Sequence, residues 1–213
     1  MIRLLALFAV LALPAMAAEP CAMCKTWNAP QLPFKVYGNT FYVGPHGLAA
    51  ILIASDAGHI LIDGGLPDSA QLIADNIAAA GFHLEDIKYI LNSHAHYDHA
   101  GGIAELQRQT GARVMGSFPS MAAMVIGGPT REDPQFGSAE IYPNVAQASP
   151  IADGEVVRLG PLKLTAHFTP GHAPGGTTWT WESCEANACK HMVYADSLTA
   201  VSSPGFKFSG DTG

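Results

Sequence analysis

The sequence predicts a layered α/β domain, because strand-like and helix-like segments alternate along most of its 213 residues. Two observations carry this prediction. Short apolar or alternating runs are separated by turns that contain Gly and Pro, which is typical of β-strands. Between some of these runs, apolar residues recur three or four positions apart, which is typical of amphipathic helices. With 22 Gly, 15 Pro and 14% charged residues, the composition indicates a turn-rich globular chain and excludes collagen and disorder.

The first predicted elements are strands. Residues 34–43 and 49–54 alternate between apolar and polar side chains, and Gly44-Pro45-His46-Gly47 forms the turn between them. Residues 59–63 are almost continuously apolar and predict a buried third strand. This strand ends at the turn Asp63-Gly64-Gly65.

A helix is predicted over residues 67–80. Pro67 is compatible with a first helical turn, Ile73 and Ile77 share one face, and Gly81 ends the helix. The remaining predicted elements are strands at 87–91, 112–116, 156–159, 162–168, 177–181 and 191–195, helices at 101–109 and 119–126, and a long loop rich in Gly, Pro and Asn at 127–150.

The N-terminus has the pattern of a secretory signal peptide. Arg3 precedes an apolar run over residues 4–13, and Ala15-Met16-Ala17 is a small-residue cleavage site. Spanning a bilayer needs about 20 apolar residues, so this run is too short to be a membrane anchor. We therefore expect a signal peptide at 1–17, a domain at 18–213 and a periplasmic location without an anchor. The net charge of −7 argues against a general nucleic-acid binder.

Export makes the four cysteines candidates for disulfide bonds. Cys184 and Cys189 flank a short turn between two strand-like runs and could close that hairpin. Cys21 and Cys24 form a CxxC beside the cleavage site, and no second CxxC completes a zinc site with them. For this pair, a terminal disulfide and bonds to other partners both stay open.

The nine histidines are nearly as many as the 11 Lys and Arg, and they concentrate after the strand predicted at 87–91. His94, His96, Asp98 and His99 lie within six positions and form an HxHxDH motif. On an extended backbone, residues two apart point the same way, so His94 and His96 can bind one metal ion. Neutral imidazoles and a carboxylate are ligands that Zn²⁺ prefers. A solvated polar turn is the alternative, but it would not explain four ligand-type residues at this spacing.

A third ligand for the first metal has to come from elsewhere. His172 is the candidate, because it lies in a loop made rigid by Gly and Pro between two predicted strands. The other histidines are predicted to be surface or structural residues: His46, His59, His83, His167 and His191.

At these residues the sequence resembles the metallo-β-lactamase superfamily. The matching segments are the HxHxDH motif, Leu61-Ile62-Asp63-Gly64-Gly65, Pro170-Gly171-His172 and Tyr194-Ala195-Asp196-Ser197-Leu198. The residues of the last segment look most like those of the third subclass of class B β-lactamases, which carry a serine where other true lactamases carry a zinc-binding cysteine. The resemblance implies a four-layer αββα sandwich with two Zn²⁺ ions at its edge.

The resemblance also implies roles for individual residues. His94, His96 and His172 would hold the first zinc, and Asp98 and His99 would hold part of the second. Asp98 would also be catalytic, because it would orient the attacking hydroxide. Ser197 and Thr199 would lie near the substrate carboxylate, and Asp63 would orient the metal-binding loop rather than bind metal.

The implied activity is hydrolysis of the β-lactam ring of penicillins, cephalosporins and carbapenems by a zinc-bound hydroxide, which confers antibiotic resistance. The substrate is a small molecule, and the protein is expected to be a monomer. No Ser-x-x-Lys pattern of serine lactamases is present. Two alternatives use the same ligands: a thioesterase of the glyoxalase-II kind or a lactonase, with Asp196 as a bridging ligand, and a non-catalytic periplasmic zinc-binding protein.

One departure from the family pattern affects the second zinc. A further histidine on a late strand normally completes that site, and no histidine follows His191 before the sequence ends at Gly213. We therefore expect the 18–213 domain to lack its C-terminal part and the second half of the sandwich to be incomplete. We also expect the first zinc to bind better than the second, with weak activity or low stability.

Overall fold

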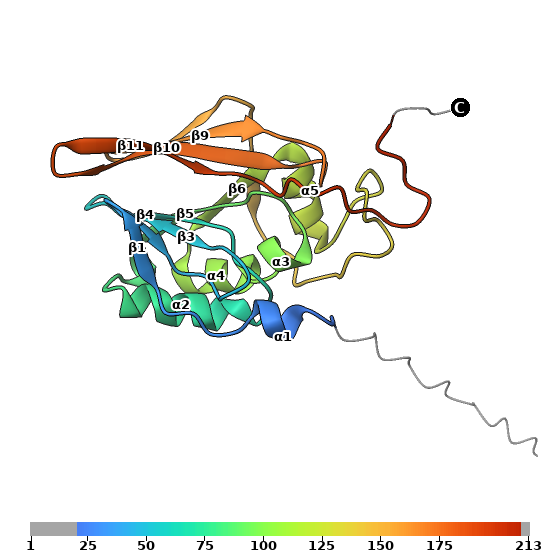
Figure 1. The fold of residues 1–213 in the computed structure, drawn as a ribbon, viewed down its shortest axis with the longest axis horizontal. Helices are drawn as coiled ribbons and strands as arrows, with labels where there is room; N and C mark the ends of the chain where they lie inside the picture. Colours follow the sequence, from blue (N-terminus) through green and yellow to red (C-terminus); the bar gives the residue numbers. More distant parts are fainter. Residues whose placement is uncertain (1–20, 210–213) are drawn as a thin grey trace, which may run out of the picture.

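The computed structural model describes residues 21–209, so the predicted signal peptide lies outside the described residues. Two β-sheets pack face to face (Figure 1). In the larger sheet, the first four strands pair with one another in antiparallel fashion. The fourth strand then pairs in parallel with the fifth, and the parallel pairing continues to the seventh. In sheet order its strands are β1 (Phe34–Tyr37), β2 (Thr40–Tyr42), β3 (Ile51–Ile53), β4 (His59–Ile62), β5 (Ile87–Leu91), β6 (Arg113–Ser117) and β7 (Ala148–Ile151).

The smaller sheet is antiparallel throughout and has the order β11-β10-β9-β8. Its strands are β8 (Val156–Leu159), β9 (Leu162–Phe168), β10 (Thr177–Glu185) and β11 (Ala188–Tyr194). Along β10, Trp179 and Trp181 are buried between the sheets, whereas the alternate residues face outward. This alternation is expected for a strand with one buried face.

The helices are short and connect the strands. They are α1 (Cys24–Trp27), α2 (Ser69–Ala79), the 3₁₀ helix η1 (Leu84–Asp86), α3 (Tyr97–Ala100), α4 (Ile103–Thr110) and α5 (Phe118–Ile126). In α2 the buried face contains Ile73 and Ile77, the two positions that predicted this helix. None of the described helices has the length and apolar character needed to cross a membrane.

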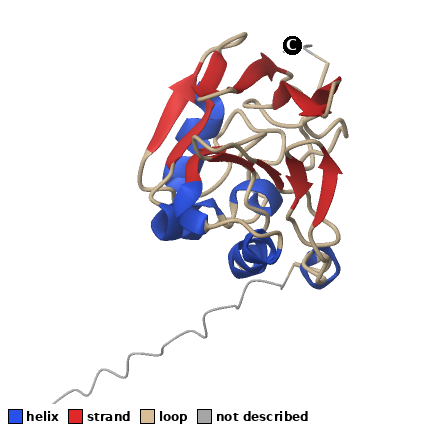
Figure 2. Cartoon of the chain, turned by 90° about the vertical axis from the view of Figure 1, so that its left-hand side faces the viewer, coloured by secondary structure: helices blue, strands red, loops and turns tan. Residues whose placement is uncertain are grey.

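Two apolar cores hold the layers together, one on each face of the larger sheet. Leu61 of β4 packs toward α2 and α4, whereas Ile60 and Ile62 of the same strand pack toward Leu164 and Trp179 of the smaller sheet. Both faces of β4 are thus buried, which explains its nearly continuous apolar sequence. Figures 1 and 2 show the smaller sheet on one side of the larger sheet and most of the helices on the other.

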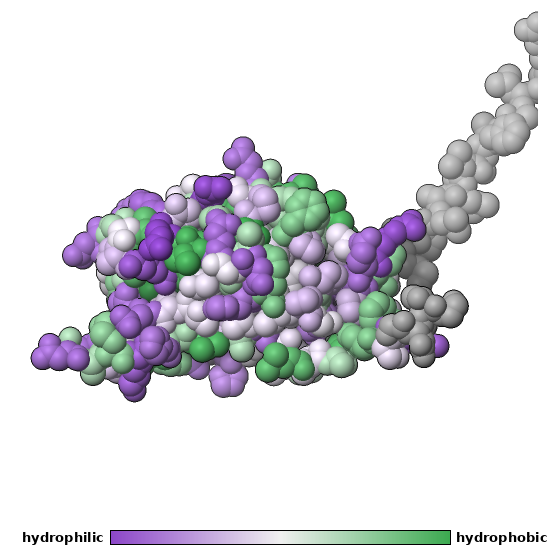
Figure 3. Space-filling view, turned by 90° about the horizontal axis from the view of Figure 1, so that it is seen from above, coloured by the Kyte–Doolittle hydropathy of each residue, from purple (hydrophilic) through white to green (hydrophobic). Residues whose placement is uncertain are grey.

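Within residues 21–209 the chain forms helix, sheet and sheet layers, which confirms the predicted mixed α/β class with two packed sheets. The outer face of the smaller sheet is not covered by any helix of these residues, and His167 and Val193 are exposed on it. Figure 3 looks onto this side, where hydrophilic and neutral residues predominate and hydrophobic residues are scattered. The second helical layer of the expected αββα sandwich is therefore not among the described elements.

Two predicted elements were wrong. Residues 34–43 do not form one strand, because the chain reverses at Gly38 and continues as β2 antiparallel to β1. Gly38 has a φ of +53°, a conformation that side chains with a Cβ rarely adopt. The Gly38-Asn39 pair is a turn signal inside the apolar run. The loop predicted at 127–150 also contains the start of β7, which pairs with β6.

Both cysteine pairs are disulfide-bonded. Cys184 and Cys189 are opposite each other in β10 and β11, and their bond closes the hairpin between these strands. Cys21 is bonded to Cys24 at the start of the described residues. Of the two alternatives left open by the sequence, the structure has the terminal disulfide.

Candidate metal centre

The candidate metal centre lies at the edge where the parallel strands end. Asp63 directly follows β4, and the HxHxDH segment follows β5. The loop 169–176 that joins β9 to β10 brings His172 to the same edge, and Asp196 follows the end of β11. Carboxyl ends of neighbouring parallel strands meet at one edge of a sheet, so segments far apart in the sequence converge there.

Glycine lets the metal-binding segment pack tightly onto the end of β4. A Cβ on Gly102 would meet the carbonyl oxygen of Gly64, so a larger residue would push the two loops apart. The backbone N–H of Gly64 donates to the carbonyl of His99 at 2.8 Å. These contacts fix the position at which α3 begins, and with it the directions of Asp98 and His99.

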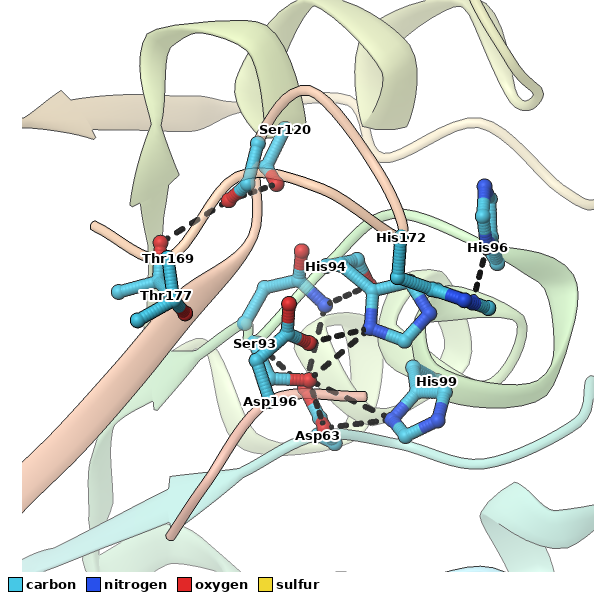
Figure 4. Close-up of polar contacts among 12 residues, drawn as sticks. Asp63, Ser93, His94, His96, His99, Ser120, Thr169, His172, Thr177 and Asp196 are labelled. Carbon is cyan, nitrogen blue, oxygen red and sulfur yellow. Dashed lines mark hydrogen bonds and ion pairs between the residues drawn. The ribbon is translucent and has the colours of Figure 1, made fainter. Parts of the chain in front are cut away.

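The loop that carries His172 is held by hydroxyl groups. The Oγ atoms of Ser117 and Ser120 and the Oγ1 of Thr177 lie 2.8–3.1 Å from the carbonyl oxygen of Gly175. A Cβ on Gly175 would meet Ser120, so glycine is needed for this close approach. Figure 4 shows Ser120 and Thr177 beside the loop that leads to His172.

The structure brings together the three histidines that the sequence predicted for the first metal. His94, His96 and His172 each offer a ring nitrogen, and these nitrogens lie within 4.8 Å of one another. His94 and His96 are buried, and His172 is partly buried. Nδ1 of His96 lies 3.2 Å from Nε2 of His172.

The other ring nitrogen of each of these histidines faces an oxygen acceptor. Nδ1 of His94 lies 2.8 Å from Oδ1 of Asp196, and Nδ1 of His172 lies 2.8 Å from the carbonyl oxygen of Thr199. Nε2 of His96 lies 2.9 and 3.0 Å from the two carboxylate oxygens of Asp133. An oxygen acceptor requires an N–H on the nitrogen that faces it, and a neutral ring then has its lone pair on the other nitrogen.

These tautomers direct three lone pairs toward one point, from Nε2 of His94, Nδ1 of His96 and Nε2 of His172. Nε2 of His94 is buried and has no hydrogen-bond partner in the described structure. Burial, followed by the neighbouring His99, His96 and His172, lowers the pKa of His94 well below its usual value, so this ring stays neutral. Converging neutral imidazoles fit a zinc ion, which would give the orphaned nitrogen a partner.

A second ligand set lies beside the first. Asp98, His99 and His94 offer atoms within 4.8 Å of one another, and Oδ2 of Asp98 lies 3.7 Å from Nε2 of His99. Burial lowers the pKa of His99, but the hydrogen bond and charge of Asp63, with Asp98 and Asp196, outweigh it and raise that pKa to about 9. Because His94 also belongs to the first set, the second has two ligands of its own here.

Asp63 is a fully buried carboxylate that contacts several parts of the centre. It accepts hydrogen bonds from the backbone N–H and the hydroxyl of Ser93, at 2.8 and 2.6 Å, and from Tyr194 at 2.9 Å. Its Oδ2 also lies 2.9 Å from Nδ1 of His99. Asp63 thus anchors the metal-binding segment through Ser93 and His99, and Figure 4 shows it below the His94 and His99 rings.

The two residues proposed to contact substrate lie after β11, and Thr199 contacts His172. Ser197 is half-buried and directly follows Asp196. Thr199 is exposed, and its Oγ1 lies 3.4 Å from Nδ1 of His172. Neither side chain is part of a ligand set in the described residues.

Two residues that contact the histidines were not predicted from the sequence. Asp133 and Gln135 both come from the long loop after α5, and Nε2 of Gln135 lies 3.3 Å from Nδ1 of His96. The only sequence signal was an Asp-Pro pair within a Gly- and Pro-rich segment, which by itself predicts a turn.

The Metallo-beta-lactamase superfamily matches residues 43–184, which is more than half of the chain. The chain belongs to this superfamily. The match contains β4 and β5, which end at the centre, and all five predicted metal ligands. The superfamily and the mixed α/β fold with two sheets that the motifs predicted are therefore confirmed.

Solved structures of this superfamily include close matches. The Rm3 metallo-beta-lactamase is 52% identical with a TM-score of 0.88, over 91% of this chain and 72% of that one. MEM-A1, a subclass B3 metallo-beta-lactamase from a soil metagenome library, is 54% identical with a TM-score of 0.85, over 87% of this chain and 70% of that one. These neighbours agree with the predicted third subclass.

Curated relatives in the superfamily are more distant. A hydroxyacylglutathione hydrolase of Anaeromyxobacter dehalogenans is 34% identical over 62% of this chain and 41% of that protein. The N-acyl homoserine lactonase AttM of Agrobacterium fabrum is 32% identical over 58% of this chain and 55% of that protein. The chain thus spans about half or less of the length of these relatives.

Proposed function

We propose that this protein is a zinc-dependent hydrolase that opens the β-lactam ring of penicillins, cephalosporins and carbapenems. The observation that carries the proposal is the convergence of three imidazole lone pairs, each fixed by an acceptor on the far side of its ring. Identities of 52% and 54% to metallo-beta-lactamases, against 34% to a thioester hydrolase, support the lactam substrate.

His94, His96 and His172 would hold the first zinc, and Asp98 and His99 would provide part of a second site. Zinc bound there supplies a Lewis acid and lowers the pKa of water toward neutrality. Two ions are expected for the native enzyme. The two ligand sets support this assignment, because three imidazoles surround the first position and a carboxylate adjoins the second.

Asp98 is the catalytic candidate. Its side chain is 29% exposed, so it can accept a hydrogen bond from a water that approaches the lactam carbonyl. In the reaction the water oxygen bonds to the carbonyl carbon, the amide C–N bond breaks, and the nitrogen takes up a proton. Ser197 and Thr199 would donate hydrogen bonds to the substrate carboxylate, and Asp63 would orient His99.

The first alternative, a thioesterase or lactonase, needs Asp196 as a bridging ligand. Here Oδ1 of Asp196 lies beside Nδ1 of His94, on the opposite side of that ring from the unpartnered Nε2. Burial raises the pKa of Asp196 to about 7. The contact of Oδ1 with His94 supports a positioning role for Asp196, and the identities of 52% and 54% to metallo-beta-lactamases favour the lactamase. The second alternative, a non-catalytic zinc-binding protein, has the same ligands. An assay for turnover distinguishes it from an enzyme.

Turnover by the purified native protein tests the proposal. A carbapenem, an acylglutathione thioester and an N-acyl homoserine lactone are assayed side by side. We expect hydrolysis of the carbapenem, loss of activity with a chelator and recovery with Zn²⁺. Hydrolysis of the thioester or the lactone without the carbapenem would support the first alternative, and no turnover of any substrate would support the second.

Asp98→Asn tests the catalytic role within that assay. The amide keeps the shape of the side chain but is a far weaker proton acceptor, so we expect kcat to fall by about 100-fold or more. Asp75→Asn is the control, because Asp75 is exposed on α2 and contacts Gln71. Equal activity of the two variants would contradict the role of Asp98.

We also propose that the protein is exported to the periplasm as a monomer and confers antibiotic resistance. The neighbours named as beta-lactamases support the resistance role. Fractionation of cells that express the native gene should recover activity in the periplasmic extract. Activity confined to the cytoplasm would contradict the predicted signal peptide.

A further inference from the structure

The segment 127–147, which follows α5, is attached to the metal-binding segment at two adjacent residues. The hydroxyl of Tyr142 donates to the carbonyl oxygen of Ala95 at 2.7 Å, and Asp133 contacts the ring of His96. Tyr142 and Asp133 are both buried, although much of the segment around them is irregular and exposed. These are the segment's two buried polar side chains within the described residues, and the partly buried Gln135 also contacts His96, with its Nε2 3.3 Å from Nδ1 of that ring.

Asp133 has few partners for a buried carboxylate. It is 5% exposed, and its Oδ1 accepts a hydrogen bond from the backbone N–H of Gln135 at 2.8 Å. Among the described residues its one ion-pair partner is His96, and no Lys or Arg contacts it. Burying a carboxylate is costly unless it is hydrogen-bonded, so Asp133 requires an N–H on Nε2 of His96.

We propose that Asp133 is a positioning residue that fixes the tautomer of His96 and couples the segment 127–147 to the metal. This inference rests on the zinc site of the proposed function. With the proton on Nε2, the lone pair of His96 is on Nδ1, the nitrogen that lies 3.2 Å from Nε2 of His172. Without Asp133 the proton is free to move to Nδ1, where it would block the metal position.

The coupling follows from the position of Asp133 in the chain. The same carboxylate that orients His96 fixes the centre of the segment, through the hydrogen bond from Gln135 and the turn from Asp133 to Phe136. Binding free energies are reciprocal. If an ordered segment strengthens zinc binding at His96, zinc binding must also order the segment.

Asp133→Asn tests the positioning role. The amide oxygen can accept from Gln135, but the amide NH₂ then faces Nε2 of His96 and favours the wrong tautomer. We expect the affinity of the first zinc, measured by competition with a chromophoric chelator, to fall about 10–100-fold. Glu132→Gln is the matched control, because Glu132 is the adjacent residue, is exposed and loses the same charge. Equal zinc affinities of the two variants would overturn the proposal.

Two measurements on the unmodified chain do not depend on the variant folding. Nitrogen NMR of the zinc-free chain should show His96 protonated at Nε2, and protonation at Nδ1 would overturn the proposal. Amide exchange of residues 129–139 should slow when zinc is added, and unchanged exchange in a zinc-loaded chain would overturn the coupling. A chain that binds no zinc but has Nε2-protonated His96 would reject the proposed function while supporting the tautomer.

Discussion

The ligand geometry is decided by acceptors on the far side of each ring. His94 and His96 are two residues apart, yet their lone pairs are on different nitrogens, because Asp196 faces Nδ1 of one and Asp133 faces Nε2 of the other. The HxHxDH spacing predicted which residues meet, since ligands on one short segment are necessarily close. It could not predict these acceptors, because they come from distant loops that only the folded chain brings near.

Among single residues, His172 is the ligand whose role is tested most simply by substitution. Replacing it with alanine removes one of the three converging nitrogens. We expect the zinc affinity of the chain to fall by at least about 100-fold, beyond the range expected for an outer partner. His167→Ala is the control, because His167 is on the outer face of the smaller sheet and contacts Thr180. A zinc affinity of His172→Ala equal to that of the control would reject His172 as a ligand.

A second single-residue prediction concerns the contribution of the buried carboxylate of Asp63 to stability. Asp63→Asn replaces one acceptor oxygen with a donor, which leaves groups around Ser93 and Tyr194 without a partner. We expect the free energy of unfolding of the zinc-free chain to fall by about 1–3 kcal/mol, measured by urea denaturation. Asp56→Asn, at an exposed position, should change it by less than about 0.5 kcal/mol. An unchanged free energy of unfolding in Asp63→Asn would show that this network does not stabilise the fold.

At the scale of single elements, local sequence predicted most of the secondary structure. The strand predicted at 87–91 has the same bounds as β5, and the helix predicted at 67–80 contains α2. Of the two failures, the turn at Gly38 had a local signal, whereas β7 has a tertiary cause. β7 contains Pro150 and has little strand character of its own, and its pairing with β6 defines it as a strand.

The prediction for an element concerns the turn into α4. In Gly102→Ala the new Cβ would meet the carbonyl oxygens of Gly64 and Leu66, which cannot move away as a flexible side chain could. We expect a clear fall in Tm, of several degrees or more. Gly171→Ala is the control, since a Cβ there meets nothing within 4 Å. Equal melting temperatures of the two variants would contradict the close packing of these loops.

At the scale of the whole molecule, the centre depends on how the two sheets pack. The indole N–H of Trp179 donates to the carbonyl of Asn92 at 3.2 Å, and the backbone N–H of Thr177 donates to that of Ser93 at 2.8 Å. These bonds join the smaller sheet to the segment that precedes His94. His172 and Asp196 are carried by the smaller sheet, so its position relative to β5 sets the distances at the centre.

Trp179→Ala tests this dependence. Trp179 is fully buried between the sheets, and removing its ring should lower the free energy of unfolding by about 3–5 kcal/mol. Zinc affinity should fall as well, because the two halves of the centre lose their fixed distance. Val193→Ala, at a position 62% exposed on the outer face, should leave both quantities nearly unchanged. A destabilised Trp179→Ala with unchanged zinc affinity would show that the centre does not depend on sheet packing.

The proposed function depends on the lone pairs of three histidines converging on one zinc position, and anomalous diffraction at the zinc absorption edge would locate that ion. Crystals grown with excess Zn²⁺ should show a peak bounded by Nε2 of His94, Nδ1 of His96 and Nε2 of His172. No peak at that point, or a peak against the opposite nitrogen of any of these rings, would contradict the claim.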